Sequence, residues 1–235
     1  MAEHGVIHSS LRRGSAILAD TIHFLRMGVG LIDFDAIAKT KLAHEPFKFV
    51  VTPGVLGAVD LATIAVDLPD IGQPGLFPLS ELSYGPAFAS LIEDIRSQEL
   101  EDIMAEKFAV DLSDKPLMIT ARGWAQKKDG RIHTDGGAKL ISCLLYLNDI
   151  WGDGGGRLRM LRGPDALEDY AAEIPPDGGT FVSFLCTKNA WHGHEPYEGE
   201  RRYVMFNWMA SQAALQWELG RHRFSAAIKR LSPFA

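Results

Sequence analysis

His133 and Asp135 lie two residues apart in the stretch RIHTDGGAKLISCLLYLN (131–148). The apolar run that follows them is typical of a buried strand, and residues just ahead of such a strand lie at its mouth, where a pocket can form. Side chains at positions i and i+2 of an extended segment point to the same side. The spacing therefore allows the imidazole and the carboxylate to bind one metal ion.

A second stretch, NAWHGHEPYEGERRYVMFNWM (189–209), supplies further candidate groups. It places His192 and His194 ahead of another apolar strand, near whose start lie Arg201 and Arg202. Two histidines and one carboxylate form a set that occupies one face of an octahedral iron and leaves the opposite face open. An arginine on the strand after the distal histidine suits bidentate binding of a dicarboxylate.

The elements that must position these groups are mainly strands, separated by turns rich in glycine and proline. We expect strands over 116–124, 140–147, 157–161, 180–186 and 201–209. Upstream, the pattern predicts a helix running into a turn over 31–47, a strand over 47–56, mostly loop over 61–79, and an amphipathic helix over 86–108 that breaks near Ser97.

Short strands after a helical half predict an antiparallel double-sheet sandwich or jelly roll, with the N-terminal helices packed on one sheet. The fold class is therefore α+β with a mainly β core. We expect a single domain over residues 1–235, with an N-terminal extension over 1–45, partly helical over 1–30, and a catalytic β core over about 116–210.

The composition, with 46% hydrophobic and 23% charged residues, is that of an ordinary globular protein. A net charge of −6 argues against a nucleic-acid partner, which normally meets a basic face. Cys143 and Cys186 each lie in an apolar run, so we expect buried reduced thiols and a reducing cytoplasm. No apolar segment is long enough to span a bilayer, and charged residues interrupt the N-terminal stretch too early for a signal peptide. We therefore expect a cytoplasmic protein with no membrane partner.

Three blocks occur in a fixed order between residues 131 and 209. The first is HTD followed by ISCLLYLND.W, the second is GGRLRM (155–160), and the third is WHGHEP......RRY.....W. They are similar to an H-x-D then YLN run, a G-G-x-L motif, and an H-x-x-x-P then R-Y-x-x-x-x-x-W block. In this order the chain resembles the 2-oxoglutarate- and Fe(II)-dependent dioxygenases, in particular their prolyl-hydroxylase-like branch.

The resemblance implies a double-stranded β-helix and a role for each matching residue. The implied catalytic residues are the three iron ligands His133, Asp135 and His192. The residues implied to bind 2-oxoglutarate are Arg202 at its distal carboxylate, Tyr146 donating to that carboxylate, Ser142 as an added hydroxyl, and Leu144 lining the pocket.

The chemistry that the resemblance implies is hydroxylation. With Fe(II), 2-oxoglutarate and O2, and with ascorbate as a candidate reductant, an aliphatic C–H becomes C–OH while succinate and CO2 are released. The substrate class stays open between an amino acid, a peptidyl residue and a small metabolite, and a homodimer stays open as well.

Two residue assignments have alternatives. His194 competes with His192 as the distal ligand; we favour His192 because Pro196 follows it by four residues, as in the family block. Arg201 fits a G-x-R pattern, whereas the R-Y pair and the spacing to the following tryptophan favour Arg202, which we choose. If His192 is the ligand, His194 becomes a contact behind it or to substrate.

A different class of protein would use the same fold and ligands. A cupin-like metal-binding protein or isomerase needs the sandwich and the metal set, but it has no dicarboxylate for an arginine and a tyrosine to hold. Use of 2-oxoglutarate separates the two alternatives.

Overall fold

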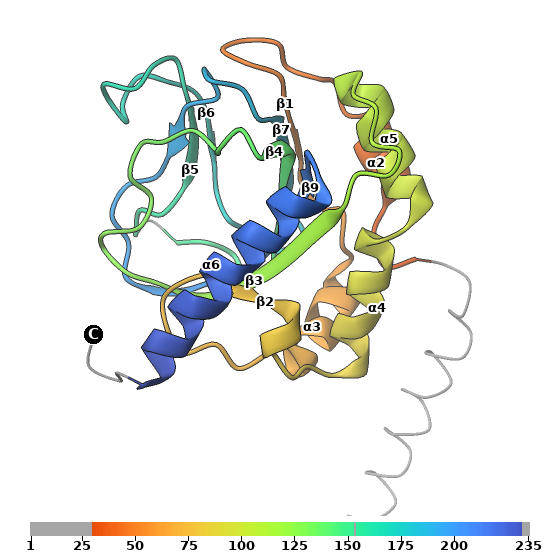
Figure 1. Ribbon diagram of the computed structural model, residues 1–235, viewed down its shortest axis with the longest axis vertical. Coiled ribbons are helices and arrows are strands. Elements are labelled where there is room, and N and C mark those ends of the chain that lie inside the picture. The colour runs from red at the N-terminus through yellow and green to blue at the C-terminus, as the bar shows by residue number, and fades with distance from the viewer. Residues whose placement is uncertain (1–29, 153, 232–235) are drawn as a thin grey trace, which may run out of the picture.

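The computed structural model describes residues 30–152 and 154–231, and its centre is a six-stranded antiparallel sheet (Figure 1). The strand order in this major sheet is β1-β7-β4-β9-β3-β2. Its strands are β1 (Phe49–Thr52), β2 (Phe77–Pro78), β3 (Leu117–Ala125), β4 (Lys139–Tyr146), β7 (Phe181–Leu185) and β9 (Gly199–Met209). The central strand β4 and the second half of β9 are mainly apolar runs, as is typical of strands that are covered on both faces.

A smaller sheet, of order β6-β5-β8, completes a second layer. It consists of β5 (Leu158–Leu161), β6 (Tyr170–Ile174) and β8 (His192–Gly193). A hydrophobic cluster with members from both sheets, including Leu144 and Tyr203 of the major sheet and Met160 of the minor one, fills the space between them. The predicted α+β fold with a double-stranded β-helix core is confirmed.

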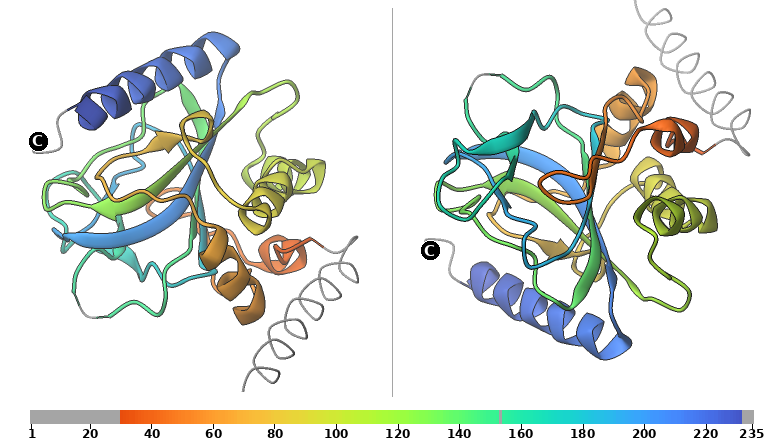
Figure 2. Two further views of the ribbon diagram at one scale, coloured as in Figure 1. Left: turned by 90° about the horizontal axis from the view of Figure 1, so that it is seen from below. Right: turned by 90° about the horizontal axis from the view of Figure 1, so that it is seen from above.

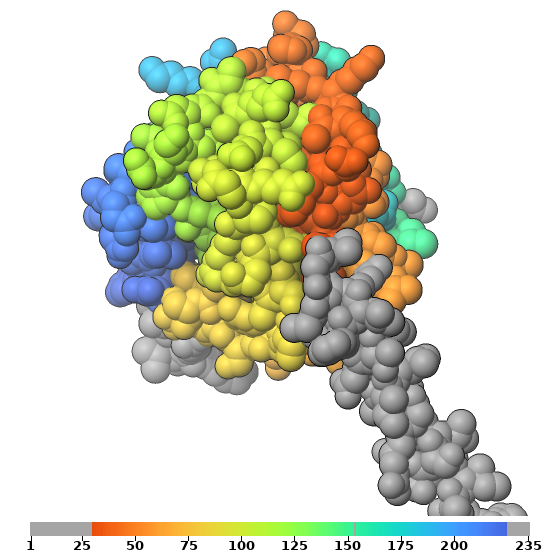
Figure 3. All heavy atoms as spheres, turned by 90° about the vertical axis from the view of Figure 1, so that its right-hand side faces the viewer, coloured from red at the N-terminus to blue at the C-terminus, as the bar shows by residue number. Residues whose placement is uncertain are grey.

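The N-terminal helices cover the other face of the major sheet, as Figure 2 shows edge-on and Figure 3 from outside. They are α2 (Phe34–Lys39), α3 (Ala58–Asp67), α4 (Pro86–Ile95) and α5 (Gln98–Phe108). The short 3-10 helix η1 (Leu79–Glu81) lies between α3 and α4 in the sequence. The expected break near Ser97 is confirmed: Ser97 caps α5 by accepting a hydrogen bond from the Leu100 amide. Buried side chains of α4 and α5 pack with those of β4 and β9 into the larger hydrophobic cluster.

The prediction of mostly loop over residues 61–79 is wrong in its first part, because α3 continues to Asp67. The glycines and prolines that suggested a loop all lie in the second half of that stretch, between Pro69 and Pro78. They end the helix rather than prevent it. Ile64 anchors α3 to the core, while Val59 and Val66 on its other side are exposed.

Other elements without a counterpart among the predicted ones include one strand and one long helix. Strand β6 pairs with β5 in the minor sheet, and α6 (Gln212–Leu231) packs across β2, β3 and β9. Leu215 of α6 meets Met118 and Met209 in a small third cluster. The residues expected to form a partly helical extension, 1–30, lie outside the described part except for Gly30.

The cysteine prediction is confirmed in that Cys143 and Cys186 are both free thiols, Cys143 being fully buried. Burial raises the pKa of Cys143 well above its ordinary value and that of Cys186 to about 12. Within the described residues, none of the helices has the length and apolar character needed to span a membrane.

Candidate active site

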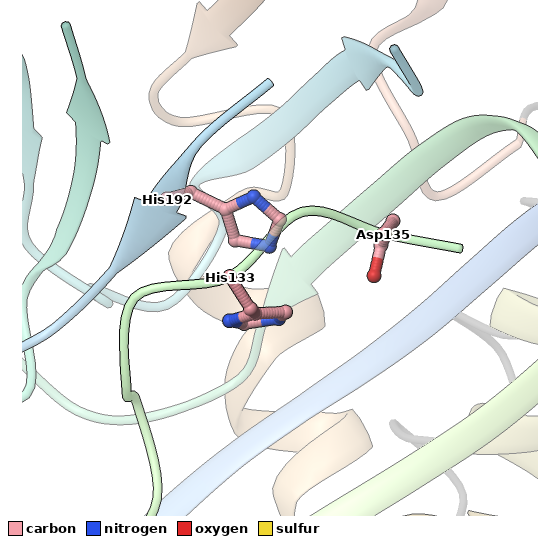
Figure 4. Close-up of side chains that lie close together, drawn as sticks. All are labelled: His133, Asp135 and His192. Carbon is pink, nitrogen blue, oxygen red and sulfur yellow. The ribbon is translucent and has the colours of Figure 1, made fainter. Parts of the chain in front are cut away.

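His133 and His192 lie on two short segments that pair through their backbones. The amide of each residue donates to the carbonyl oxygen of the other, at 3.0 Å in both directions. The two ring centroids are 4.3 Å apart (Figure 4). Since His192 belongs to β8, this bridge attaches His133 to the free edge of the minor sheet. Backbone pairing therefore places the two imidazoles side by side although they are distant in sequence.

Asp135 lies where the chain crosses from the minor to the major sheet, between that bridge and the start of β4. Its carboxylate is 8% exposed and both of its oxygens are engaged. Lys139 Nζ lies 3.1 Å from Oδ1, and the Ser142 hydroxyl donates to Oδ2. One donor atom each from His133, Asp135 and His192 lies within 4.8 Å of the other two, so the three groups could together hold one ion.

The hydrogen positions on the two histidine rings suit metal binding. Nδ1 of His133 lies 2.7 Å from the Arg131 carbonyl oxygen and Nδ1 of His192 lies 2.9 Å from that of Ala190. A carbonyl can only accept, so Nδ1 carries the hydrogen in each ring and Nε2 keeps its lone pair for a metal.

Electrostatics acts in the same direction. Burial, assisted by His133, lowers the pKa of His192 to about 4, so its ring is neutral at physiological pH. Burial raises the pKa of Asp135, but Lys139, His192 and the Ser142 hydroxyl outweigh it and hold that pKa at about 2. One nitrogen from each of two imidazoles and one carboxylate are the donor set that fits Fe(II) with open coordination positions.

A cavity of about 150 Å³ begins at His133 and His192 and extends between the sheets to Arg201. The Arg201 side chain is buried, with the residue 2% exposed. Its Nε donates to the Gly156 carbonyl oxygen at 3.1 Å and its Nη2 to the Tyr146 hydroxyl at 3.2 Å. Leu144 lines the wall between the two ends. The cavity therefore runs from the two imidazoles of His133 and His192 to the buried guanidinium of Arg201.

The choice of Arg202 in the sequence analysis is corrected by the structure. Arg202 lies on the opposite face of β9, where its guanidinium pairs with Glu200 at 2.8 Å and borders surface pockets outside the cavity. Its side chain is 37% exposed. Arg201 shares the cavity face of β9 with Tyr203 and Met205. Only Arg201 of the two can reach a ligand beside the histidines.

Ser142 is also placed differently from expectation. It lies on the cavity-facing side of β4 with Leu144 and Tyr146, but its hydroxyl bonds to Asp135 and to Asn207 rather than lining the cavity. The sequence analysis did not single out Asn207, which bonds to Ser142, or Lys139, which pairs with Asp135. Their signals were a polar residue inside the apolar run VMFNWM and a cation four residues after Asp135.

His194 lines the same cavity but stands apart from the converging set. Its amide donates to the Gly130 carbonyl oxygen at 2.8 Å, and its Nδ1 lies 2.8 Å from the Glu195 carbonyl oxygen. Burial and the nearby Arg201 lower its pKa to about 4. It contributes a neutral ring with a free Nε2 lone pair to the cavity wall.

Comparison with known proteins gives a family and several structures of similar shape. Residues 122–210 match the model of the 2OG-Fe(II) oxygenase superfamily. No curated protein matches the chain. A prolyl-4-hydroxylase from Pseudomonas putida is 18% identical, with 75% of this chain and 90% of that chain covered at a TM-score of 0.48.

Two further solved structures contain 2-oxoglutarate. The viral collagen prolyl hydroxylase of Paramecium Bursaria Chlorella virus-1 is 14% identical, with 70% of this chain and 96% of that chain covered at a TM-score of 0.46. HygX from Streptomyces hygroscopicus, with nickel and 2-oxoglutarate bound, is 16% identical, with 70% and 82% covered at a TM-score of 0.45.

The family match includes every candidate site residue that the sequence analysis singled out. His133, Asp135 and His192 lie within it, as do Tyr146 and both arginines. The resemblance inferred from the three sequence blocks is thus confirmed. Residues 122–210 match the 2OG-Fe(II) oxygenase superfamily, and this match supports a 2-oxoglutarate-dependent dioxygenase that uses Fe(II).

Proposed function

We propose that the chain hydroxylates an aliphatic C–H, with His133, Asp135 and His192 holding Fe(II) and with Arg201 and Tyr146 holding the distal carboxylate of 2-oxoglutarate. The net reaction converts R–H, 2-oxoglutarate and O2 into R–OH, succinate and CO2. One oxygen atom enters the product and the other enters succinate. The four electrons that reduce O2 come from the C–H bond and from the oxidative decarboxylation of 2-oxoglutarate.

The observation that carries this proposal is the state of Arg201. Among the described residues no carboxylate lies within ion-pair distance of its guanidinium, although the side chain is buried. Burying a charge is costly unless an opposite charge or enough hydrogen bonds compensate it. Tyr146 and Gly156 use only part of its fork of N–H donors. The remaining donors suit a carboxylate bound bidentately.

Tyr146 complements Arg201 at this end of the cavity. Its hydroxyl oxygen accepts from Arg201, which leaves the phenolic hydrogen free to donate to the same carboxylate. Burial raises the pKa of Tyr146, so the phenol keeps that hydrogen at physiological pH. The Arg201 guanidinium and the Tyr146 phenol together fix one end of an extended diacid, with Leu144 along its side.

At the other end of the cavity, His133, Asp135 and His192 would hold the Fe(II). When bound, Fe(II) supplies the activation of oxygen that no side chain of the protein can perform. The apolar residues that close the cavity, among them Leu158, Phe184 and Met205, exclude water from the reacting centre.

The substrate is proposed to be an amino acid, a peptidyl residue or a small metabolite. The cavity of about 150 Å³ must also hold 2-oxoglutarate, so the room at the metal admits a reacting group rather than a large molecule. Exposed His133 lies at the mouth, where such a group would enter.

The test uses two adjacent arginines that face opposite sides of one strand. Metal-free protein is titrated with Fe(II) without oxygen, then with 2-oxoglutarate, while visible absorbance is followed. We expect a charge-transfer band that needs both additions and disappears in His192→Ala. Arg201→Ala should weaken 2-oxoglutarate binding at least 100-fold, whereas Arg202→Ala should leave it within about threefold.

The other outcomes are equally informative. Tight Fe(II) binding with no band on adding 2-oxoglutarate would favour the cupin-like alternative. Normal 2-oxoglutarate affinity in Arg201→Ala would remove the residue on which the proposal rests. Release of succinate, measured against a panel of amino acids and peptides, would then identify the substrate class.

A further inference from the structure

A buried polar chain connects Asp135 to the centre of the major sheet. Ser142 of β4 and Asn207 of β9 are directly opposite each other in the strand register. Asn207 Nδ2 donates to Ser142 Oγ at 2.7 Å, and Ser142 Oγ donates to Asp135 Oδ2. Ser142 and Asn207 are both completely buried. We propose that Ser142 and Asn207 act as positioning residues that hold the Asp135 carboxylate in its metal-binding orientation; this inference rests on the proposed function.

The direction of each hydrogen bond is fixed by the chemistry of the ends. An ionised carboxylate can only accept, and an amide nitrogen can only donate. The single hydroxyl hydrogen of Ser142 must therefore point to Asp135, and its oxygen must accept from Asn207. Cys186 Sγ lies 3.2 Å from the same oxygen and can supply a further weak donor. Asn207 therefore sets the orientation of the Ser142 hydroxyl, and that hydroxyl in turn holds one oxygen of Asp135.

Asp135 gains from such a support because glycines, which have the greatest backbone freedom, follow it directly. It is followed by Gly136 and Gly137, and a Cβ at either glycine would meet nothing within 4 Å. The other carboxylate oxygen faces the Lys139 ammonium, which competes with a metal for it. With Oδ2 held by Ser142, the carboxylate is fixed on a second side, and its ligand atom stays within 4.8 Å of those of His133 and His192.

Burying the Ser142–Asn207 pair carries a free-energy cost, which indicates that the pair does more than stabilise the sheet. Asn207 Oδ1 is buried and has no hydrogen-bond partner among the described residues. An unsatisfied buried acceptor destabilises a fold, and apolar replacement of a buried polar pair is often neutral or stabilising. A polar pair at this depth is therefore explained by what it holds, which is the carboxylate of the proposed metal site.

The experiment measures metal affinity without turnover. Metal-free protein is titrated with Mn(II), and the EPR signal of the free ion gives the fraction bound. We expect Ser142→Ala to bind Mn(II) 10- to 100-fold more weakly, the usual effect of losing a partner behind a metal ligand. Asn207→Leu should weaken binding by a smaller factor while leaving the urea midpoint unchanged or higher. The double variant should be no weaker than Ser142→Ala alone, because both changes break the same chain.

Two controls separate positioning from folding. Ser183→Ala makes the same chemical change at another fully buried serine, one whose Oγ has no hydrogen-bond partner, and should keep native Mn(II) affinity. Ser142→Thr keeps a hydroxyl and should recover most of the affinity lost in Ser142→Ala.

The possible outcomes distinguish this inference from the proposed function. If native protein binds Mn(II), His192→Ala does not, and Ser142→Ala binds as tightly as native, the positioning role is wrong while the metal site stands. If the losses of Mn(II) affinity in the two single variants add up in the double variant, Ser142 and Asn207 do not act through one another, and the proposed positioning role is also wrong. Absence of Mn(II) binding in the native protein would overturn both.

Discussion

Gly193 lies so close to Gly130 that no side chain fits between them. A Cβ at Gly193 would come within 2.8 Å of the Gly130 carbonyl oxygen, which already accepts from the His194 amide. This contact holds the segment before His133 against β8. The backbone bridge between the two histidines depends on that approach.

Gly193→Ala should therefore separate the two segments and weaken metal binding by at least tenfold. The expected measurement is Mn(II) affinity by EPR, with the urea midpoint as a check on folding. Gly163→Ala is the matched control, because a Cβ there meets nothing within 4 Å. Native affinity in Gly193→Ala would mean that the bridge tolerates displacement.

Tyr146→Phe tests the tyrosine at the arginine end of the cavity. Removing the hydroxyl deletes one donor to the 2-oxoglutarate carboxylate and one acceptor for Arg201. A hydrogen bond to a charged group is worth about 1.5–3 kcal/mol, so 2-oxoglutarate affinity should fall by about 10- to 100-fold. Fe(II) affinity should not change. A parallel loss of both affinities would show that the hydroxyl supports the fold rather than the cosubstrate.

Lys139→Met tests the competition for Asp135. The ammonium lies 3.1 Å from the carboxylate oxygen that would otherwise be free for the metal. Removing a positive charge at this distance should tighten divalent metal binding severalfold at pH 7.5, where Asp135 stays ionised. Exposed Lys127, which lies 3.8 Å from Glu198, gives the control Lys127→Met with unchanged affinity. Weaker binding in Lys139→Met would instead assign the ammonium a supporting role.

The metal-free protein should lose stability as pH falls from 6.5 toward 4. His192 and His194 have pKa values of about 4 in the folded protein and 6.5 as the ordinary value. Between these values the unfolded chain binds protons that the folded protein does not, so protonation favours unfolding. At pH 5 each histidine should cost about 2 kcal/mol. The Asp135 titration falls below this window, since its pKa is about 2.

The measurement is the urea midpoint of metal-free protein at pH 7.5, 6 and 5. His194→Gln should make the decline shallower by removing one of the two titrations without touching the three proposed ligands. A midpoint that stays constant from pH 7.5 to 5 would contradict the buried, neutral state of both rings.

The sequence was sufficient for β1, β3, β4, β5, β7 and β9, because apolar runs and turn residues are local patterns, but it did not predict β2, β6 or β8. The period of two along β4 places Leu144 and Tyr146 on one face, as observed. The same alternation separates Arg201 from Arg202 but does not say which one faces inward. That depends on how β9 pairs with its neighbours, where Tyr146 is opposite Tyr203.

A bulge adds to this ambiguity. The register between β3 and β9 shifts between Arg122 and Trp124, opposite the stretch that contains both arginines. Bulges of this kind change which way side chains point and leave no reliable local signal. Long-range pairing likewise determined the contacts of Ser142, whose partner Asn207 comes from a distant strand.

The crossing of the chain at residues 133–135 gives the proposed ion a mechanical role. His133 and His192 belong to the edge of the minor sheet, and Asp135 leads into the major sheet. A bound ion would therefore cross-link the two sheets. At a free concentration 100 times its Kd, such an ion adds about 2.7 kcal/mol to stability. Chelation should then lower the thermal midpoint and open this edge to proteases, so that the supply of iron would govern the lifetime of the protein as well as its activity.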